Sequence, residues 1–183
     1  MLLLRKVARS GLLLSIALVP AVLGQQTSRD VMIGAKLTAG FDMGVNSSEN
    51  KTNWVKSEDG QMRMAYPPDQ SWGAVFITVG KPKQPPRPFR DFSAYSTLTI
   101  EMKGGVGGEE LEIGLKTNAQ PDDGSETKLP VKLTSDWKQY RFPVARFDGA
   151  DPDKLYVVTE FVFSGGAAAT VFVRNISFSN ATR

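Results

Sequence analysis

The residue types that this sequence lacks limit its chemistry more than the types it contains. The 183-residue chain has no histidine and no cysteine. Serine–histidine–aspartate triads, thiolate nucleophiles, disulfides, and zinc or iron–sulfur sites built on these side chains are therefore excluded. The groups that remain for chemistry are carboxylates, lysines, tyrosines and hydroxyls, together with metal ions held by oxygen ligands.

Two glutamates have a spacing that would suit acid–base chemistry. Glu110 and Glu112 are two residues apart in ELEIGLK, so on a β-strand both side chains point to the same face. Retaining glycosidases need two carboxyl groups about 5–5.5 Å apart. However, Lys116 follows on that face, and its ammonium would keep a carboxylate ionised, which is wrong for a general acid. A small glycosidase or lyase using Glu110 and Glu112 is therefore the alternative hypothesis, not the leading one.

The first 24 residues have the pattern of a secretory signal peptide. Basic residues stand at positions 5, 6 and 9, and the apolar run GLLLSIALV follows at 11–19. That run is too short for a membrane span, which needs roughly 20 residues. We therefore expect residues 1–24 to be a signal peptide, residues 25–183 to form a single domain, and the protein to be secreted into the extracellular space or the periplasm.

Removal of this segment changes the charge balance of the protein. The full sequence has 22 Lys and Arg against 19 Asp and Glu, a formal net charge of +3. Three of the basic residues lie in the first 24, so the remaining chain has 19 charges of each sign and is formally neutral. A neutral domain gives no support to nucleic-acid binding.

The rest of the chain alternates apolar and polar residues over short runs that are separated by Gly, Pro, Asn and Asp. In TLTIEMK, for example, Leu98, Ile100 and Met102 share one face, while Glu101 and Lys103 share the other. A period of two is typical of half-buried antiparallel strands. The sequence predicts ten strands, at 31–41, 52–56, 61–66, 72–79, 97–103, 110–117, 128–133, 138–144, 155–163 and 170–178.

Ten short strands with turn residues between them predict an all-β fold, an antiparallel two-sheet β-sandwich of the jelly-roll kind. Pro130 lies inside one strand, so we expect that strand at a sheet edge, where a missing N–H is tolerated. In the last strand Val173 and Ile176 have opposite phases. A bulge at Arg174 and Asn175 would place both side chains on the same face.

Five segments carry a likeness to a known group of domains. They are Gly40-Phe41-Asp42 with Asn53-Trp54, YPPDQSWGAVF at 66–76, RDFSAYSTLTI at 90–100, LTSDWKQYRFPV at 133–144, and TVFVRNISF at 170–178. Their order and spacing resemble the β-jelly-roll carbohydrate-binding modules of the galactose-binding-domain-like group. The resemblance implies a non-catalytic domain that binds a poly- or oligosaccharide. From the charge balance and the short apolar run we expect no nucleic acid as partner and no membrane span.

The binding groups of such a domain would be exposed aromatic and polar side chains. Sugar rings stack on flat aromatic faces, while amides, carboxylates and arginine bond the hydroxyls. Trp72 follows a loop tip, Tyr156 is out of phase with its apolar neighbours, and Arg141 lies on a predicted exposed face. The planar donors of arginine suit vicinal hydroxyls or a uronate. The predicted ligand contacts are Trp72, Tyr156, Trp54 and Arg141.

The resemblance also implies a structural calcium ion between the first and last strands. Asp42 and Asn175 stand at the matching ends, and we expect them among the six to eight oxygen ligands that Ca²⁺ takes. A third hypothesis, beside the binding module and the enzyme, is a protein-interaction domain of the cell envelope that shares only the fold.

Overall fold

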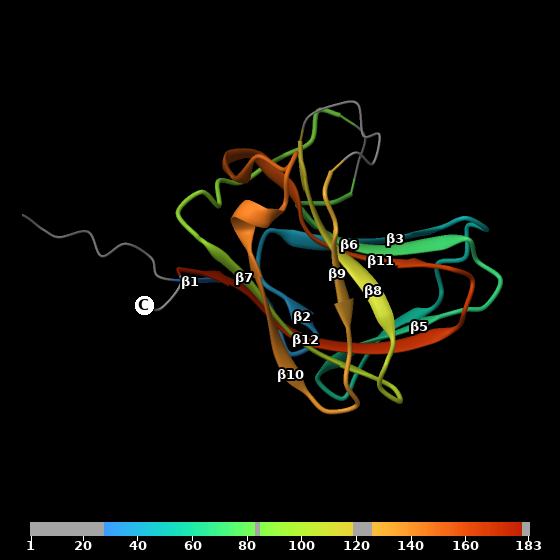
Figure 1. The fold of residues 1–183 in the computed structure, drawn as a ribbon. Coiled ribbons are helices and arrows are strands. Elements are labelled where there is room, and N and C mark those ends of the chain that lie inside the picture. The colour runs from blue at the N-terminus through green and yellow to red at the C-terminus, as the bar shows by residue number, and fades with distance from the viewer. Residues whose placement is uncertain (1–27, 83–84, 119–125, 181–183) are drawn as a thin grey trace, which may run out of the picture.

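The computed structural model describes residues 28–82, 85–118 and 126–180 (Figure 1). These ranges contain strands β1 to β12 and two short 3-10 helices, η1 (Val144–Arg146) and η2 (Pro152–Lys154). All strand pairs in the two sheets are antiparallel, which confirms the predicted two-sheet β-sandwich. None of the helices in this part of the chain has the length and hydropathy of a membrane span. The predicted signal peptide lies outside the described residues.

The first sheet, here called sheet A, runs in the order β10-β7-β12-β1-β2, and β5 and β4 join it through the pairing of β5 with β12. Its strands are β1 (Ser28–Ile33), β2 (Lys36–Leu37), β4 (Val55–Glu58), β5 (Gln61–Tyr66), β7 (Thr97–Gly104), β10 (Lys138–Pro143) and β12 (Ala169–Ser179). The second sheet, sheet B, has the order β3-β6-β11-β8-β9. Its strands are β3 (Phe41–Ser47), β6 (Trp72–Val79), β8 (Glu110–Thr117), β9 (Leu129–Lys132) and β11 (Leu155–Ser164).

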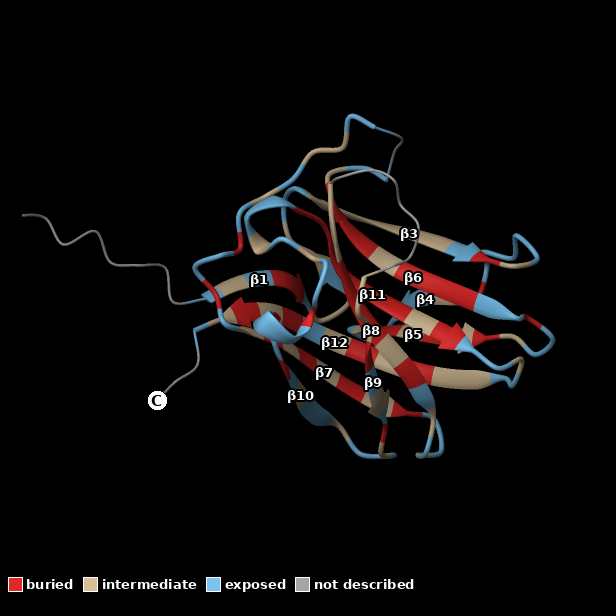
Figure 2. Ribbon diagram, turned by 45° about the horizontal axis from the view of Figure 1, so that its top comes forward, coloured by how far each residue is buried: buried red, intermediate tan, exposed pale blue. Residues whose placement is uncertain are grey.

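The core lies between the two sheets, because alternate residues of each strand turn toward the other sheet. Figure 2 shows this as buried residues alternating with more exposed ones along β7. Leu98, Ile100 and Met102 from sheet A are fully buried, as are Ile113 and Phe161 from sheet B. Each such side chain contributes about 1.5–3 kcal/mol by leaving water. The period-two pattern therefore identified the inner faces correctly.

Three aromatic rings close one end of this core. Tyr66 and Phe163 are stacked with ring centroids 5.0 Å apart, and Trp54 meets each of them edge-on at 5.6 Å. The indole N–H of Trp54 donates to the carbonyl of Lys51 at 2.8 Å, so its polar atom is satisfied inside the protein. With 6% of its surface exposed, Trp54 is a core residue, and it offers no open ring face for the ligand contact that the sequence predicted.

The predicted strand 31–41 is wrong. The chain instead makes the hairpin β1–β2 and then a separate strand, β3, that joins the other sheet. Gly34 and Gly40 have φ of 60° and 86°, a left-handed conformation that glycine adopts without strain and that interrupts an extended strand. The apolar residues on either side of these glycines kept the alternation and concealed the two breaks.

Two local predictions are confirmed. β9, which contains Pro130, is the edge strand of sheet B. The pairing of β12 with β7 shifts register between Arg174 and Ile176, and Asn175 has φ of 52°, so a bulge lies at this point. The bulge keeps Val173 and Ile176 both fully buried on the core side.

Candidate functional site

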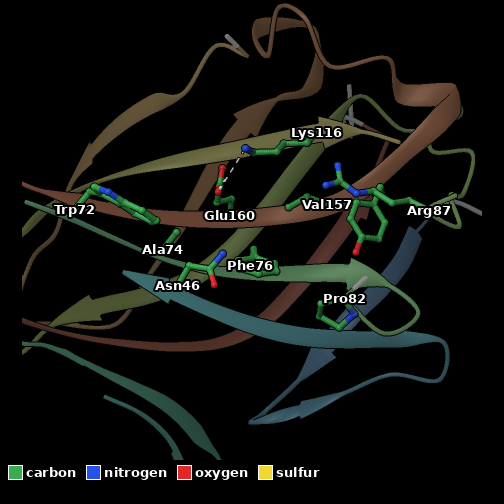
Figure 3. Close-up of a pocket in the computed structure, with 10 residues that line it drawn as sticks. Asn46, Trp72, Ala74, Phe76, Pro82, Arg87, Lys116, Val157 and Glu160 are labelled. Atoms are coloured by element: carbon green, nitrogen blue, oxygen red, sulfur yellow. Dashed lines mark ion pairs between the residues drawn. The ribbon is translucent and has the colours of Figure 1, made fainter. Parts of the chain in front are cut away.

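A groove of about 590 Å³ lies on the outer face of sheet B, the face turned away from the core (Figure 3). The strands β3, β8 and β11, together with the segment that follows β6, supply its walls. Its lining residues are Asn46, Trp72, Ala74, Phe76, Pro82, Arg87, Lys116, Tyr156, Val157 and Glu160.

The strand β6 supplies the floor of this groove. Trp72, Ala74 and Phe76 alternate with residues that point into the core, so all three side chains face outward. Phe76 lies opposite Gly44 of β3, where a Cβ atom would be 2.3 Å from the phenyl ring. The missing side chain at Gly44 therefore gives the Phe76 ring its place in the floor.

Trp72 is the exposed aromatic residue of the groove. It opens β6 and keeps 44% of its surface accessible. Figure 3 shows its indole at one end of the groove and Arg87 at the other. A flat, accessible ring at the edge of a polar groove is the kind of surface on which a pyranose ring stacks.

Tyr156 also lines the groove, but its ring is not open. Only 4% of the residue is exposed. The guanidinium carbon of Arg87 lies 5.0 Å from the centre of the tyrosine ring, a cation–π contact that covers it. At this end of the groove a ligand therefore meets Arg87 before it meets the Tyr156 ring.

Charged groups of both signs stand side by side in the groove wall. The Lys116 ammonium lies 3.9 Å from a Glu160 oxygen and 3.8 Å from a Glu126 oxygen, and these side chains are mostly buried. A Cβ atom on Gly114, which pairs with Glu160, would be 3.0 Å from the other Glu160 oxygen. Glycine thus leaves room for this carboxylate, and the wall offers both a hydrogen-bond acceptor and a donor.

Residues 25–180 match the family described as Carbohydrate binding domain 30. The chain belongs to this family. It is therefore a non-catalytic carbohydrate-binding domain, and the hypotheses of a glycosidase and of a protein-interaction domain are set aside. No curated protein sequence gives a significant match.

Solved structures of similar fold are carbohydrate-binding modules. The family 30 module of a cellulosomal cellulase of Clostridium thermocellum is 18% identical with a TM-score of 0.59, over 85% of this chain and 99% of the module. A family 29 module complexed with cellulohexaose is 15% identical with a TM-score of 0.56, over 84% of this chain and 90% of the module. Another family 29 module, complexed with mannohexaose, is 16% identical with a TM-score of 0.55, over 84% of this chain and 91% of the module. At these identities the likeness shows the fold.

The structure of this family 30 domain separates the four predicted ligand contacts. Trp72 and Tyr156 line the same groove, although they are far apart in the sequence. Trp54 lies in the core, and Arg141 lies on β10, in the opposite sheet.

Of the ten residues given as lining the groove, two, Trp72 and Tyr156, were predicted as ligand contacts, and three of the others show why the rest were missed. Asn46 was missed because its strand was not predicted, and Glu160 because it lies in an apolar run. Phe76 shares its phase with Trp72 on a correctly predicted strand, so this signal was present in the sequence.

The two glutamates of the enzyme hypothesis lie outside the groove. Glu110 Oε1 accepts from Lys132 Nζ at 2.9 Å, and both side chains are well exposed. Lys116, expected to hold this pair ionised, is engaged instead with Glu126 and Glu160. Neither Glu110 nor Glu112 lines the groove of sheet B.

The two residues of the expected calcium site lie in different sheets. Asp42 accepts from the backbone N–H of Met43, while Asn175 accepts from Gly34 N–H and donates to Glu101. Across the described ranges no three acidic side chains gather closely enough to hold a metal ion. Calcium stays a prediction, measurable as a rise in Tm with CaCl2 that EGTA reverses.

Proposed function

We propose that the groove on sheet B binds one chain of a neutral hexose polysaccharide, with Trp72 as the stacking platform. The observation that carries this proposal is the exposed indole of Trp72 beside a groove that is lined by amide, carboxylate, ammonium and guanidinium groups. Related modules in complex with cellulohexaose and mannohexaose support hexose chains of this kind as ligands.

Stacking on Trp72 supplies the apolar part of the binding energy. A tryptophan presents up to about 250 Å² of surface, of which less than half is accessible here. At about 25 cal/mol per Å², covering this area contributes about 2 kcal/mol, which corresponds to about thirtyfold in affinity.

Hydrogen bonds from the groove wall supply selectivity. The Asn46 amide both donates and accepts, Glu160 accepts, and Lys116 donates. Because Lys116 holds Glu160 in place before the ligand arrives, little side-chain freedom is lost on binding. The sheet thus presents a largely formed site to the sugar hydroxyls.

Calorimetric titration with cellulohexaose and mannohexaose tests this function. We expect Trp72→Ala to lower the affinity for whichever hexaose the wild type binds more tightly by about thirtyfold, while the Tm stays unchanged. Phe89→Ala is the matched control, because Phe89 is similarly exposed but does not line the groove. Equal affinity of Trp72→Ala and the wild type, or no binding of either hexaose by the wild type, would reject the proposal.

We further propose that the protein acts outside the cytoplasm, directed there by residues 1–24. The basic start and apolar run of this segment support the proposal. N-terminal sequencing of the protein recovered from the culture medium or periplasm should find a start near Gln25. Recovery only from the cytoplasm with Met1 intact would contradict it.

A further inference from the structure

The outer face of sheet A carries a row of basic and aromatic side chains that crosses four strands and ends just before a fifth, β10. By strand register Lys56 lies opposite Arg63, Arg63 opposite Phe172, and Phe172 opposite Lys103. Trp137, just before β10, completes the row beside Lys103. Directly opposite residues share a face of a sheet, and on β5, β7 and β12 the residues on either side of the row are buried. This set of five residues is called the basic row below.

Aromatic rings hold the cations of this face without neutralising them. Lys103 Nζ lies 5.0 Å from the Phe172 ring centre and 5.4 Å from that of Trp137. The guanidinium of Arg174 covers Trp137 at 4.3 Å. An uncharged ring fixes the position of a cation but leaves its charge available to a ligand. Because these cations occupy the ring faces, the row is suited to an anionic ligand more than to ring stacking.

Positive charge exceeds negative charge on strands β4, β5, β7, β10 and β12 of this face. Arg63 pairs with Glu58 at 3.8 Å and Arg174 with Glu101 at 2.6 Å. The hydrogen bond from Arg174 holds the pKa of Glu101 below its ordinary value, so this carboxylate remains committed to the arginine. Within the described ranges no carboxylate lies at ion-pair distance from the remaining three cations, Lys56, Lys103 and Arg141.

Arg141 stands in a hollow of about 390 Å³ on the same face. Arg141 lies opposite Thr99 of β7, and Thr99 lies opposite Ser177 of β12. Among the described residues that line the hollow, Arg141 is the only charged one. The lining consists of Thr97, Thr99, Gln139, Arg141, Pro143, Ser177, Ser179 and Asn180. Asp30 of β1 lies opposite Ser177, so an acidic side chain follows on this side of the hollow. A lone guanidinium among hydroxyls and amides suits a carboxylate on a sugar ring.

We propose that the outer face of sheet A is a second carbohydrate site, one that binds a uronate-bearing polysaccharide. Arg141 takes one carboxylate in a bidentate fork, and the hydroxyls around it bond the ring hydroxyls of the same sugar. Lys103 in the basic row meets a carboxylate further along the chain. Thr99, opposite Arg141, and Lys103 are four residues apart on β7, or about 13 Å, so one extended chain passes over both. This site lies on the other side of the sandwich from the groove and does not depend on its function.

Affinity electrophoresis in gels containing polygalacturonate tests the second site. We expect the wild type to be retarded at low salt, and the double variant Lys103→Gln/Arg141→Gln to bind at least about tenfold more weakly. The matched control is Lys132→Gln/Lys154→Gln, which removes two positive charges away from sheet A and should bind as the wild type does. Salt should weaken the interaction, since exposed charges are screened within about 10 Å at 0.1 M. Circular dichroism melting checks that each variant is folded.

Three outcomes would overturn the proposal. They are no retardation of the wild type, equal loss in both double variants, and equally tight binding of dextran sulfate, oligothymidylate or phosphatidylserine vesicles. The last would show a general response to polyanions instead of uronate recognition. Trp72→Ala should keep its polygalacturonate affinity, so failure at the groove and failure at sheet A are distinguished.

Discussion

The ammonium of Lys116 lies between the carboxylates of Glu160 and Glu126, 3.9 Å from the first and 3.8 Å from the second. Lys116 comes from β8 and Glu160 from the neighbouring strand β11, so two strands of sheet B build this arrangement. It brings a hydrogen-bond acceptor and a donor into the groove next to the β6 floor.

Glu160→Gln should weaken hexaose binding while leaving the fold intact. The amide keeps the shape of the side chain but accepts hydrogen bonds less strongly than a carboxylate, and charge-assisted bonds are about twice as strong as neutral ones. We expect a loss of about tenfold in affinity by calorimetry. Glu110→Gln removes an exposed carboxylate on the neighbouring strand and should bind with wild-type affinity. Equal affinities for both variants would place Glu160 outside the binding site.

Gly44→Ala should destabilise the domain by about 1–3 kcal/mol, because its Cβ would lie 2.3 Å from the Phe76 ring. The backbone at Gly44 does not have a positive φ, so steric overlap is the cause. Urea unfolding measures the change in free energy. In a Phe76→Ala background the overlap is absent. Gly44→Ala should therefore lower the free energy of unfolding much less in that background than in the wild type. Strict additivity would contradict this explanation.

Removing the Trp54 side chain should destabilise the fold strongly, whereas removing the Trp72 side chain should hardly change its stability. Trp54→Ala should lower the free energy of unfolding by about 3–5 kcal/mol, because it leaves a cavity beside the stacked rings of Tyr66 and Phe163. Trp72→Ala should change it by less than about 0.5 kcal/mol, since the ring is largely exposed. Denaturant titrations followed by circular dichroism give both values. A large loss of stability in Trp72→Ala would show that this ring supports the fold.

The pair of Glu101 and Arg174 should make stability depend on acid pH. The pKa of Glu101 lies below its ordinary 4.5 in the folded protein, chiefly through the hydrogen bond from Arg174, with a second bond from Asn175. The unfolded chain therefore binds the proton first, and the stabilisation, complete above pH 4.5, is lost as the pH falls through the folded pKa. Glu101→Gln should be less stable than the wild type at pH 7, and the difference should shrink on acidification. A difference that stays constant from pH 7 to pH 2 would argue against this linkage.

Much of the fold could be predicted because the information is local. Alternation with period two identified most strands and their inner faces, as in Leu98, Ile100 and Met102. Pro130 indicated an edge strand, since it has no N–H to donate, and the phase change between Val173 and Ile176 indicated the bulge. The boundary at Gly34 was missed, because apolar neighbours kept the pattern across a backbone turn.

Tertiary structure alone decided which outward side chains share a surface. Period two shows that Lys116 and Arg141 both point away from the core, but not that one lies in sheet B and the other in sheet A. It also could not bring Trp72 and Tyr156 into one groove, or bury Trp54 against Tyr66 and Phe163. Strand order is set by contacts between residues far apart in the chain, and a local pattern carries no record of the partner strand. The inward face of each strand was thus determined by sequence, whereas the composition of each outer surface was determined by how the strands pair.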